Sequence, residues 1–118
     1  MDHVLNTDEL PWKVFAADTL KGYEMKPGVI GAEYTDAYSA DLVRVAPGGY
    51  SASHVDKERH AFYIVSGRGV ITIGDDSFGV SAGSIVKFPP LVPHAVRNNG
   101  DVDLVLLAIY DPPRLRRL

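Results

Sequence analysis

Residues 48–67, GGYSASHVDKERHAFYIVSG, place three candidate metal ligands between turns marked by glycine. Side chains alternate across a β-strand, so the side chains of His54 and Asp56 point to the same face, about 7 Å apart along the backbone. After a short connection, His60 opens a run of β-branched and aromatic residues that predicts the next strand. This stretch therefore predicts two strands whose shared interior face can hold an ion.

A second stretch, residues 83–98 (GSIVKFPPLVPHAVRN), adds a fourth candidate ligand, His94. It follows Pro89, Pro90 and Pro93, whose restricted φ angles fix the approach of the chain. Three of the four histidines thus fall in two segments framed by Gly and Pro. Neutral imidazoles with one carboxylate suit Fe(II), Mn(II), Zn(II) or Ni(II). We therefore predict one divalent transition metal ion, with the ligands His54, Asp56, His60 and His94.

Short β-branched runs separated by Gly, Pro, Asn and Asp begin at Asp41, a pattern typical of consecutive antiparallel strands. The predicted strands are residues 42–45, 51–55, 61–65, 70–73, 77–80, 84–88, 94–97 and 104–110. Eight short strands at this spacing predict an all-β fold with a closed or sandwiched barrel. Within the last turn, Asn99-Gly100 is typical of a tight hairpin.

The first forty residues contain two further predicted strands, 12–16 and 29–34, with Lys26-Pro27-Gly28 as a turn before the second. No long stretch shows helical periodicity. A chain of 118 residues has room for one ordinary domain. We expect a single domain over residues 1–118, with a core barrel at about 41–111 and a strand-rich extension at 1–40.

The composition is that of a globular protein, with 46% hydrophobic and 23% charged residues. The net charge of −3 and the lack of a broad basic stripe argue against a nucleic-acid partner. No apolar run approaches the ~18 residues of a membrane span, so we expect no membrane partner and a cytoplasmic location. There is no cysteine, so any metal must be held by nitrogen and oxygen. The basic cluster of Arg114, Arg116 and Arg117 is expected to be a solvated tail or an intersubunit salt-bridge donor.

The two stretches together resemble the motifs of the cupins. The first cupin motif has Gly, five residues, His-x-His, three or four residues, Glu, six residues and Gly; the matching positions here are Gly48, His54, Asp56, His60 and Gly67. The second has Gly, five residues, Pro-x-Gly, two residues, His, three residues and Asn; the matching positions are Gly83, Pro89, His94 and Asn98. Leu91 departs from it at the inner glycine. The resemblance implies a double-stranded β-helix, the cupin or jelly-roll barrel.

The other departures leave the ligand set open. With a histidine at the Glu position, the chain resembles small single-domain cupins that hold manganese, iron or zinc with four histidines. Asp56 changes such a site into three His and one Asp. Alternatively, His54, Asp56 and His94 resemble the two-His-one-carboxylate triad of non-haem iron oxygenases, with His60 as an extra ligand or a base. In a third interpretation, Asp56 is a general base over a three-His metal. Asp56 and His60 are thus the candidate catalytic residues.

Alternation from the ligands predicts which side chains surround the ion. Tyr50 and Ala52 precede His54 on its face, and Phe62 follows His60. Tyr63 alternates to the opposite face of its strand, while Arg44 and Phe88 lie on other strands; all six are candidates for a substrate pocket. A mostly apolar cavity with a few polar groups fits a small organic substrate.

Three functions follow from the resemblance, because cupins perform many reactions. The leading hypothesis is an Fe(II)- or Mn(II)-dependent oxygenase. The alternatives are a non-redox lyase, isomerase or cyclase that uses the metal to polarise a carbonyl group, and a non-catalytic protein that binds a small molecule. The resemblance also implies a homodimer formed through edge strands.

Overall fold

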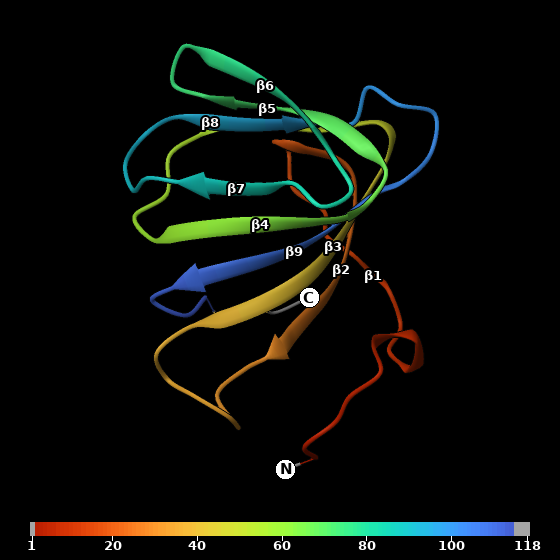
Figure 1. The fold of residues 1–118 in the computed structure, drawn as a ribbon, viewed down its shortest axis with the longest axis vertical. Helices are drawn as coiled ribbons and strands as arrows, with labels where there is room; N and C mark the ends of the chain where they lie inside the picture. Colours follow the sequence, from red (N-terminus) through yellow and green to blue (C-terminus); the bar gives the residue numbers. More distant parts are fainter. Residues whose placement is uncertain (1, 115–118) are drawn as a thin grey trace.

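The computed structural model describes residues 2–114, which form nine strands and one short 3₁₀ helix (Figure 1). The helix is η1 (Thr7–Glu9). The strands are β1 (Lys13–Val14), β2 (Leu20–Ile30), β3 (Ser39–His54), β4 (Arg59–Ser66), β5 (Arg68–Ile73), β6 (Asp76–Ser81), β7 (Ile85–Phe88), β8 (His94–Arg97) and β9 (Leu104–Asp111).

All strand pairs are antiparallel, and they join into one sheet that curls around a common interior (Figure 1). The order of strands is β6-β5-β8-β3-β9-β4-β7, and β2 adds to β3 while β1 adds to β2. Neighbours in the sheet are mostly distant in the sequence, as in a jelly roll. The all-β double-stranded β-helix predicted from the sequence is confirmed.

The interior is filled by residues that alternate along each strand. In β9, Leu104, Leu106, Ala108 and Tyr110 are buried, while the residues between them are partly exposed. The same alternation buries Val43 and Val45 in β3 and Phe62 and Ile64 in β4. These side chains form one apolar core, which extends to Ile71, Phe88 and Val96.

Two predicted strands, 42–45 and 51–55, are one long strand, β3, which continues through Pro47-Gly48-Gly49. Gly48 has a φ of 78°, in the region that glycine tolerates best. Its N–H donates to the carbonyl of Asn98 at 3.0 Å, so the backbone just after β8 provides a partner at this irregular position. Gly67 also needs its small size, because a Cβ there would collide with the carbonyl oxygen of Asp103.

Strand β2 differs from the prediction. The turn predicted at Lys26-Pro27-Gly28 lies inside this strand, and the predicted strand 29–34 keeps only its first two residues. The register against β3 shifts between Lys26 and Ile30, which is where Pro27 falls. A proline is compatible with such an irregular segment because it has no N–H to donate there.

The hairpin predicted at Asn99-Gly100 is wrong, because β8 and β9 do not pair with each other. The buried Asn98 side chain holds this loop instead. Its amide donates to the carbonyl of Val45 at 2.9 Å and to that of Val102 at 2.8 Å. Its side-chain oxygen accepts from the N–H of Gly100 at 2.9 Å.

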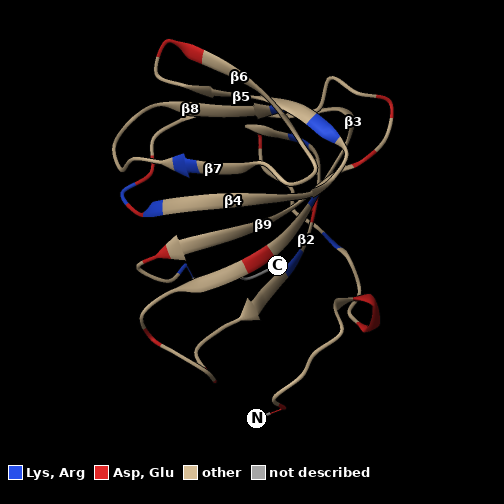
Figure 2. Ribbon diagram, viewed as in Figure 1, with Lys and Arg blue, Asp and Glu red and all other residues tan. Residues whose placement is uncertain are grey.

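The N-terminal segment is fixed to the outside of the sheet through Trp12. Its ring lies between two cations, with the Lys26 ammonium 4.5 Å and the Arg44 guanidinium 4.4 Å from the ring centroid. Lysine and arginine residues are scattered along strands and loops in the view of Figure 2. No helix in residues 2–114 is long and apolar enough to cross a membrane.

Candidate metal centre

Two of the predicted ligands face each other across neighbouring strands. His54 ends β3 and His94 begins β8, and the two residues are paired in the register of these strands. Their ring centroids are 4.2 Å apart. His94 is almost fully buried, whereas His54 is partly exposed.

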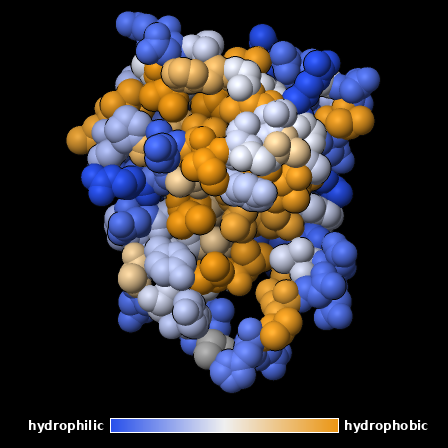
Figure 3. All heavy atoms as spheres, viewed as in Figure 1, coloured by the Kyte–Doolittle hydropathy of each residue, from blue (hydrophilic) through white to orange (hydrophobic). Residues whose placement is uncertain are grey.

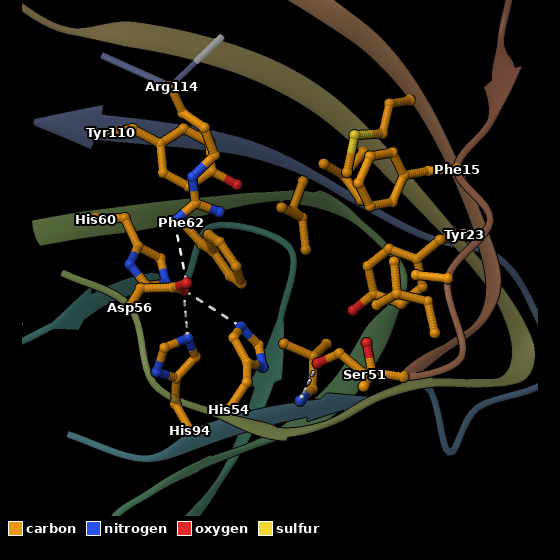
Figure 4. A pocket seen from close by; sticks show the side chains of 17 residues that line it. Phe15, Tyr23, Ser51, His54, Asp56, His60, Phe62, His94, Tyr110 and Arg114 are labelled. Atoms are coloured by element: carbon orange, nitrogen blue, oxygen red, sulfur yellow. Dashed lines mark hydrogen bonds and ion pairs between the residues drawn. The ribbon is translucent and has the colours of Figure 1, made fainter. Parts of the chain in front are cut away.

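Asp56, in the loop after β3, completes a compact group with these histidines (Figure 4). Its Oδ2 lies 3.2 Å from Nε2 of His54 and 3.1 Å from Nε2 of His94. One potential ligand atom from each of the three residues lies within 4.8 Å of the others. The group is therefore small enough to surround one ion.

The outer nitrogens of both histidines fix which ring atom faces inward. Nδ1 of His54 is 2.9 Å from the carbonyl of Ala52, and Nδ1 of His94 is 3.0 Å from the carbonyl of Val92. A carbonyl only accepts, so both Nδ1 atoms carry a hydrogen, and Nε2 of each ring faces Asp56. Two ring nitrogens that face one carboxylate oxygen need a proton or a cation between them. This donor set fits a divalent cation, and backbone carbonyls commonly orient metal-binding histidines in this way.

His60 lies beside this group rather than within it. It is buried on β4, its ring stacks on Phe88 at 4.3 Å, and its centroid is 4.7 Å from that of His94. Burial and the neighbouring His94 lower the pKa of His60 to about 4, so its ring is neutral near pH 7. Its Nδ1 is buried without a hydrogen-bond partner in the described part of the chain. A neutral imidazole at this position can coordinate a metal ion or accept a proton.

Arg114 belongs to the site, which corrects the prediction that it is part of a solvated tail or an intersubunit contact. Its Nη2 lies 3.3 Å from Oδ1 of Asp56, and its Nε donates to Oε1 of Glu58 at 3.0 Å. Burial raises the pKa of Asp56, but the charge of Arg114, together with the nearby histidines when they are protonated, outweighs it, and the pKa falls below its usual value. Arg116 and Arg117 lie outside the described residues.

A bulge in β3 changes which residues face the candidate metal site. Tyr50 pairs with Arg97 and Ser51 with Val96, but the next pair is His54 with His94, so β3 has one extra residue. The extra residue reverses the alternation, and the buried Ser51 lies on the ligand side. Tyr50 and Ala52, placed there by strict alternation, line the outer surface instead.

The other pocket candidates fall in different places. Phe62 lines the cavity next to the histidines. Phe88 lies behind His60, where it packs against the ring. Tyr63 is exposed on the outside of β4, and Arg44 pairs with Glu24 at 2.9 Å on the outside of β3.

A cavity of about 230 Å³ opens from this group, with one polar and one apolar end (Figure 4). Sequence reasoning missed the residues of β2 and the segment before it that form the apolar end, namely Phe15, Tyr23 and Met25. Burial raises the pKa of Tyr23 to about 12, so its hydroxyl stays protonated and can donate a hydrogen bond. Tyr23 and Met25 lie on β2, where the sequence did not predict a strand. Phe15 falls in the predicted strand 12–16, but nothing in its spacing links it to the ligands.

Leu91 occupies the position of the inner glycine in the second cupin motif. Its φ is 64°, a conformation that costs a side chain with Cβ roughly 1–2 kcal/mol and that glycine adopts freely. Its N–H donates to the carbonyl of Asp56 at 2.9 Å. The strained backbone at Leu91 therefore supports the loop that carries the carboxylate.

The Cupin domain family matches residues 41–110 of this chain, which include all four candidate ligands. The chain belongs to the cupin family. An uncharacterized protein of Methanocaldococcus jannaschii is 38% identical over 52 residues, which are 44% of this chain and 42% of that protein. The match therefore spans less than half of the length of this curated relative.

Three solved structures resemble this cupin closely in fold. A predicted oxalate decarboxylase of Thermotoga maritima is 23% identical, with a TM-score of 0.81 over 92% of this chain and 98% of that one. The polyketide cyclase RemF of Streptomyces resistomycificus is 16% identical, with a TM-score of 0.85 over 98% and 83%. A cupin 2 conserved barrel domain protein of Rhodopseudomonas palustris is 25% identical, with a TM-score of 0.74 over 91% and 72%.

Proposed function

We propose that this cupin is an enzyme that binds one divalent transition metal ion and oxygenates a small organic molecule with Fe(II) or Mn(II) bound. The observation that supports it most is the approach of one Asp56 oxygen to the Nε2 atoms of His54 and His94. This is the two-His-one-carboxylate donor set of non-haem iron oxygenases, which leaves other coordination positions open. His60 is proposed as a further ligand or as a catalytic base.

Each side chain has a distinct role in this proposal. The backbone carbonyls of Ala52 and Val92 hold the two imidazoles with Nε2 inward. Arg114 keeps one oxygen of Asp56 occupied, which leaves the other oxygen for the ion. The bound metal supplies the redox chemistry with O₂. The apolar end of the cavity excludes water and holds the carbon skeleton of the substrate.

The test is to strip metal from tag-free protein with a chelator and reload it separately with Fe(II), Mn(II) or Zn(II). Product formation and oxygen consumption are then measured on a panel of small organic acids and enolisable ketones, in air and under nitrogen. We expect one ion per chain and product only from the iron or manganese form in air. Binding of panel members without any turnover would favour the non-catalytic alternative.

A non-redox lyase, isomerase or cyclase is the second candidate, and His60 is the observation that favours it. The ring of His60 lines the cavity and is neutral near pH 7, so it can accept a proton from a substrate. Such a reaction needs the metal only as a Lewis acid, so zinc supports it and oxygen is irrelevant. Full activity of the zinc form under nitrogen would replace the oxygenase proposal with this one.

We also propose that two chains form a homodimer through the outer face of β7, β4 and β9. Tyr63 of β4 pairs with Ile85 of β7 and Leu107 of β9, and both Tyr63 and Ile85 are exposed. Apolar side chains gather in the middle of this face in Figure 3. An apolar area of this kind on the surface of a protein commonly marks an interface.

Light scattering should give a mass near twice 12.8 kDa. Ile85→Glu should give the monomer, whereas Phe78→Glu, at another exposed apolar position on β6, should leave the dimer intact. A strict monomer of the unmodified chain at micromolar concentration would refute the dimer.

A further inference from the structure

We propose that Arg114 recognises the substrate in this cavity, and that the substrate is a small organic carboxylate whose anionic group lies beside Asp56, with one oxygen on the metal ion and the other on the guanidinium. The inference rests on the proposed metal site and adds to it the chemical class of the substrate. It does not depend on whether the reaction uses oxygen.

Arg114 is the only lysine or arginine among the described residues that line the cavity. In Figure 4 its guanidinium points into the cavity and approaches Asp56 from the side opposite to His54 and His94. The carboxylate of Asp56 thus separates the guanidinium from the expected position of the ion. A ligand oxygen that reaches the ion can have its partner oxygen within reach of Arg114.

The guanidinium is held in place before any ligand arrives. The N–H of Arg114 donates to Oγ of Ser39 at 2.8 Å, which fixes the backbone. The guanidinium lies 4.2 Å above the ring of Tyr110, and Glu58 accepts from its Nε. A fork of donors that is already ordered loses little entropy on binding an anion.

Some N–H groups of the Arg114 guanidinium also remain available for a ligand. It carries five N–H groups, and the ion pairs within residues 2–114 involve its Nε and one terminal nitrogen. The remaining N–H groups can form the paired hydrogen bonds that arginine makes with a carboxylate.

The charge of the loaded site favours an anion. The carboxylates of Asp56 and Glu58 balance the two charges of a divalent ion. With Arg114 included, the loaded site has one net positive charge beside a cavity with a largely apolar lining. A single negative charge on the ligand neutralises the site, whereas a neutral ligand leaves that net charge in place.

The apolar end of the cavity limits the size and polarity of the rest of the substrate. Met25, Phe62 and Leu106 line it, and the whole cavity of about 230 Å³ has the volume of roughly eight liquid water molecules. The ligand that fits is a carboxylate on one compact apolar group, rather than a sugar or a nucleotide.

The experiment compares carboxylates with neutral amides of the same shape. Acetate, propionate and phenylacetate, and the three corresponding amides, are titrated into zinc-loaded protein by calorimetry, and the metal content of each sample is measured. We expect a preference for at least one carboxylate over its amide. Arg114→Gln should reduce this preference about ten- to hundredfold, the loss typical of a charge-assisted hydrogen bond. Arg114→Lys should keep part of it, because the charge remains without the planar fork.

Arg97→Gln is the matched control, because Arg97 is an exposed arginine of β8 outside this cavity. Its preference for the carboxylate should equal that of the unmodified protein. A protein that shows no carboxylate preference with full metal content would overturn the inference.

An Arg114→Gln variant that loses metal affinity but keeps the preference would also overturn it, since Arg114 would then only position Asp56. Failure of the unmodified protein to take up metal would instead overturn the proposed function, and with it the charge balance used here.

Discussion

The polar and apolar ends of the cavity differ in how their groups are satisfied. At the apolar end, Phe62, Leu106 and Met25 are buried in mutual contact as part of the core. At the polar end, an Asp56 oxygen faces two ring nitrogens, His60 has an unpaired Nδ1, and Leu91 holds a positive φ. Unsatisfied and strained groups collect at functional sites, where the surrounding structure holds them. The apolar end therefore stabilises the barrel, and the polar end is arranged for a ligand.

The largest predicted effect is on metal binding at the polar end. His94→Ala should lower metal affinity by more than about a hundredfold, because even the outer partners of a ligand contribute roughly ten- to a hundredfold. The chain should stay folded, since the side chains of the apolar core all remain, including Phe88, against which His94 packs. Metal analysis after dialysis against a chelator and circular dichroism test both statements.

His3→Ala removes the remaining histidine, at an exposed position near the N-terminus, and is the matched control. It should leave metal content unchanged. Stoichiometric metal in His94→Ala would show that the ligands are wrongly assigned.

At the apolar end we expect a loss of stability with little change in metal affinity. Leu106 is 1% exposed, so Leu106→Ala should lower the free energy of unfolding by about 2–5 kcal/mol through the cavity it leaves. Metal affinity of the folded variant should change little, because no ligand is supported by this side chain alone. Urea unfolding of metal-free protein and a metal titration give the two values.

Leu5→Ala makes the same deletion at a position that is 48% exposed, and should cost less than about 0.5 kcal/mol. If Leu106→Ala instead lost metal without losing stability, the two ends would not be separable in the way proposed.

The sequence predicted the apolar pattern and the ligand pairs because both depend on local spacing. The alternation in 104–110 predicts its strand and its inward face directly. His54 and Asp56 are two residues apart, and the structure brings them together with His94. The faces predicted for Tyr50 and Ala52 were wrong because one extra residue in β3 reverses the alternation. The sequence of residues 51–54 carries no signal for this bulge.

Residues brought by tertiary contacts could not be predicted from spacing. Arg114 reaches Asp56 because its backbone is bound to Ser39, 75 positions earlier in the chain. In the sequence it stands in a basic tail, which usually indicates a solvated segment. Tyr23 was missed for a different reason, since Pro27 and Gly28 indicated a turn inside what is strand β2. Phe15 lies in the predicted strand 12–16, but its place in the cavity depends on tertiary packing.

An intermediate effect is predicted for Asp56, which pairs with the candidate ligand His94 on one side and with Arg114 on the other. If it is a ligand, Asp56→Asn should weaken metal binding about ten- to hundredfold, because a neutral amide replaces an anionic oxygen. Asp56→His should keep metal, since it gives four nitrogen donors. Metal titration and turnover are measured for both.

Glu58→Gln is the matched control, because it also removes a negative charge that pairs with Arg114 but lies outside the compact group. It should affect metal affinity less than Asp56→Asn does. Unchanged affinity with lost turnover in Asp56→Asn would identify Asp56 as a base instead, and no change in either variant would exclude it from the site.

The smallest effect is expected at Leu91, where the polar end carries backbone strain that the apolar end lacks. Leu91→Gly should raise the free energy of unfolding by about 0.5–1 kcal/mol. The relief of roughly 1–2 kcal/mol from the positive φ exceeds the added flexibility of the unfolded chain, about 0.5–1 kcal/mol. Little packing is lost, because Leu91 is 67% exposed.

Leu91→Ala separates these terms, because it removes the same side chain but keeps the Cβ that causes the strain. It should stay within about 0.5 kcal/mol of the unmodified protein in urea unfolding. If the glycine variant gained no more than the alanine variant, the strain at this loop would be negligible. A gain in stability together with weaker metal binding would show that the strained loop holds Asp56 in its working position, because the N–H of Leu91 is bonded to the carbonyl of that residue.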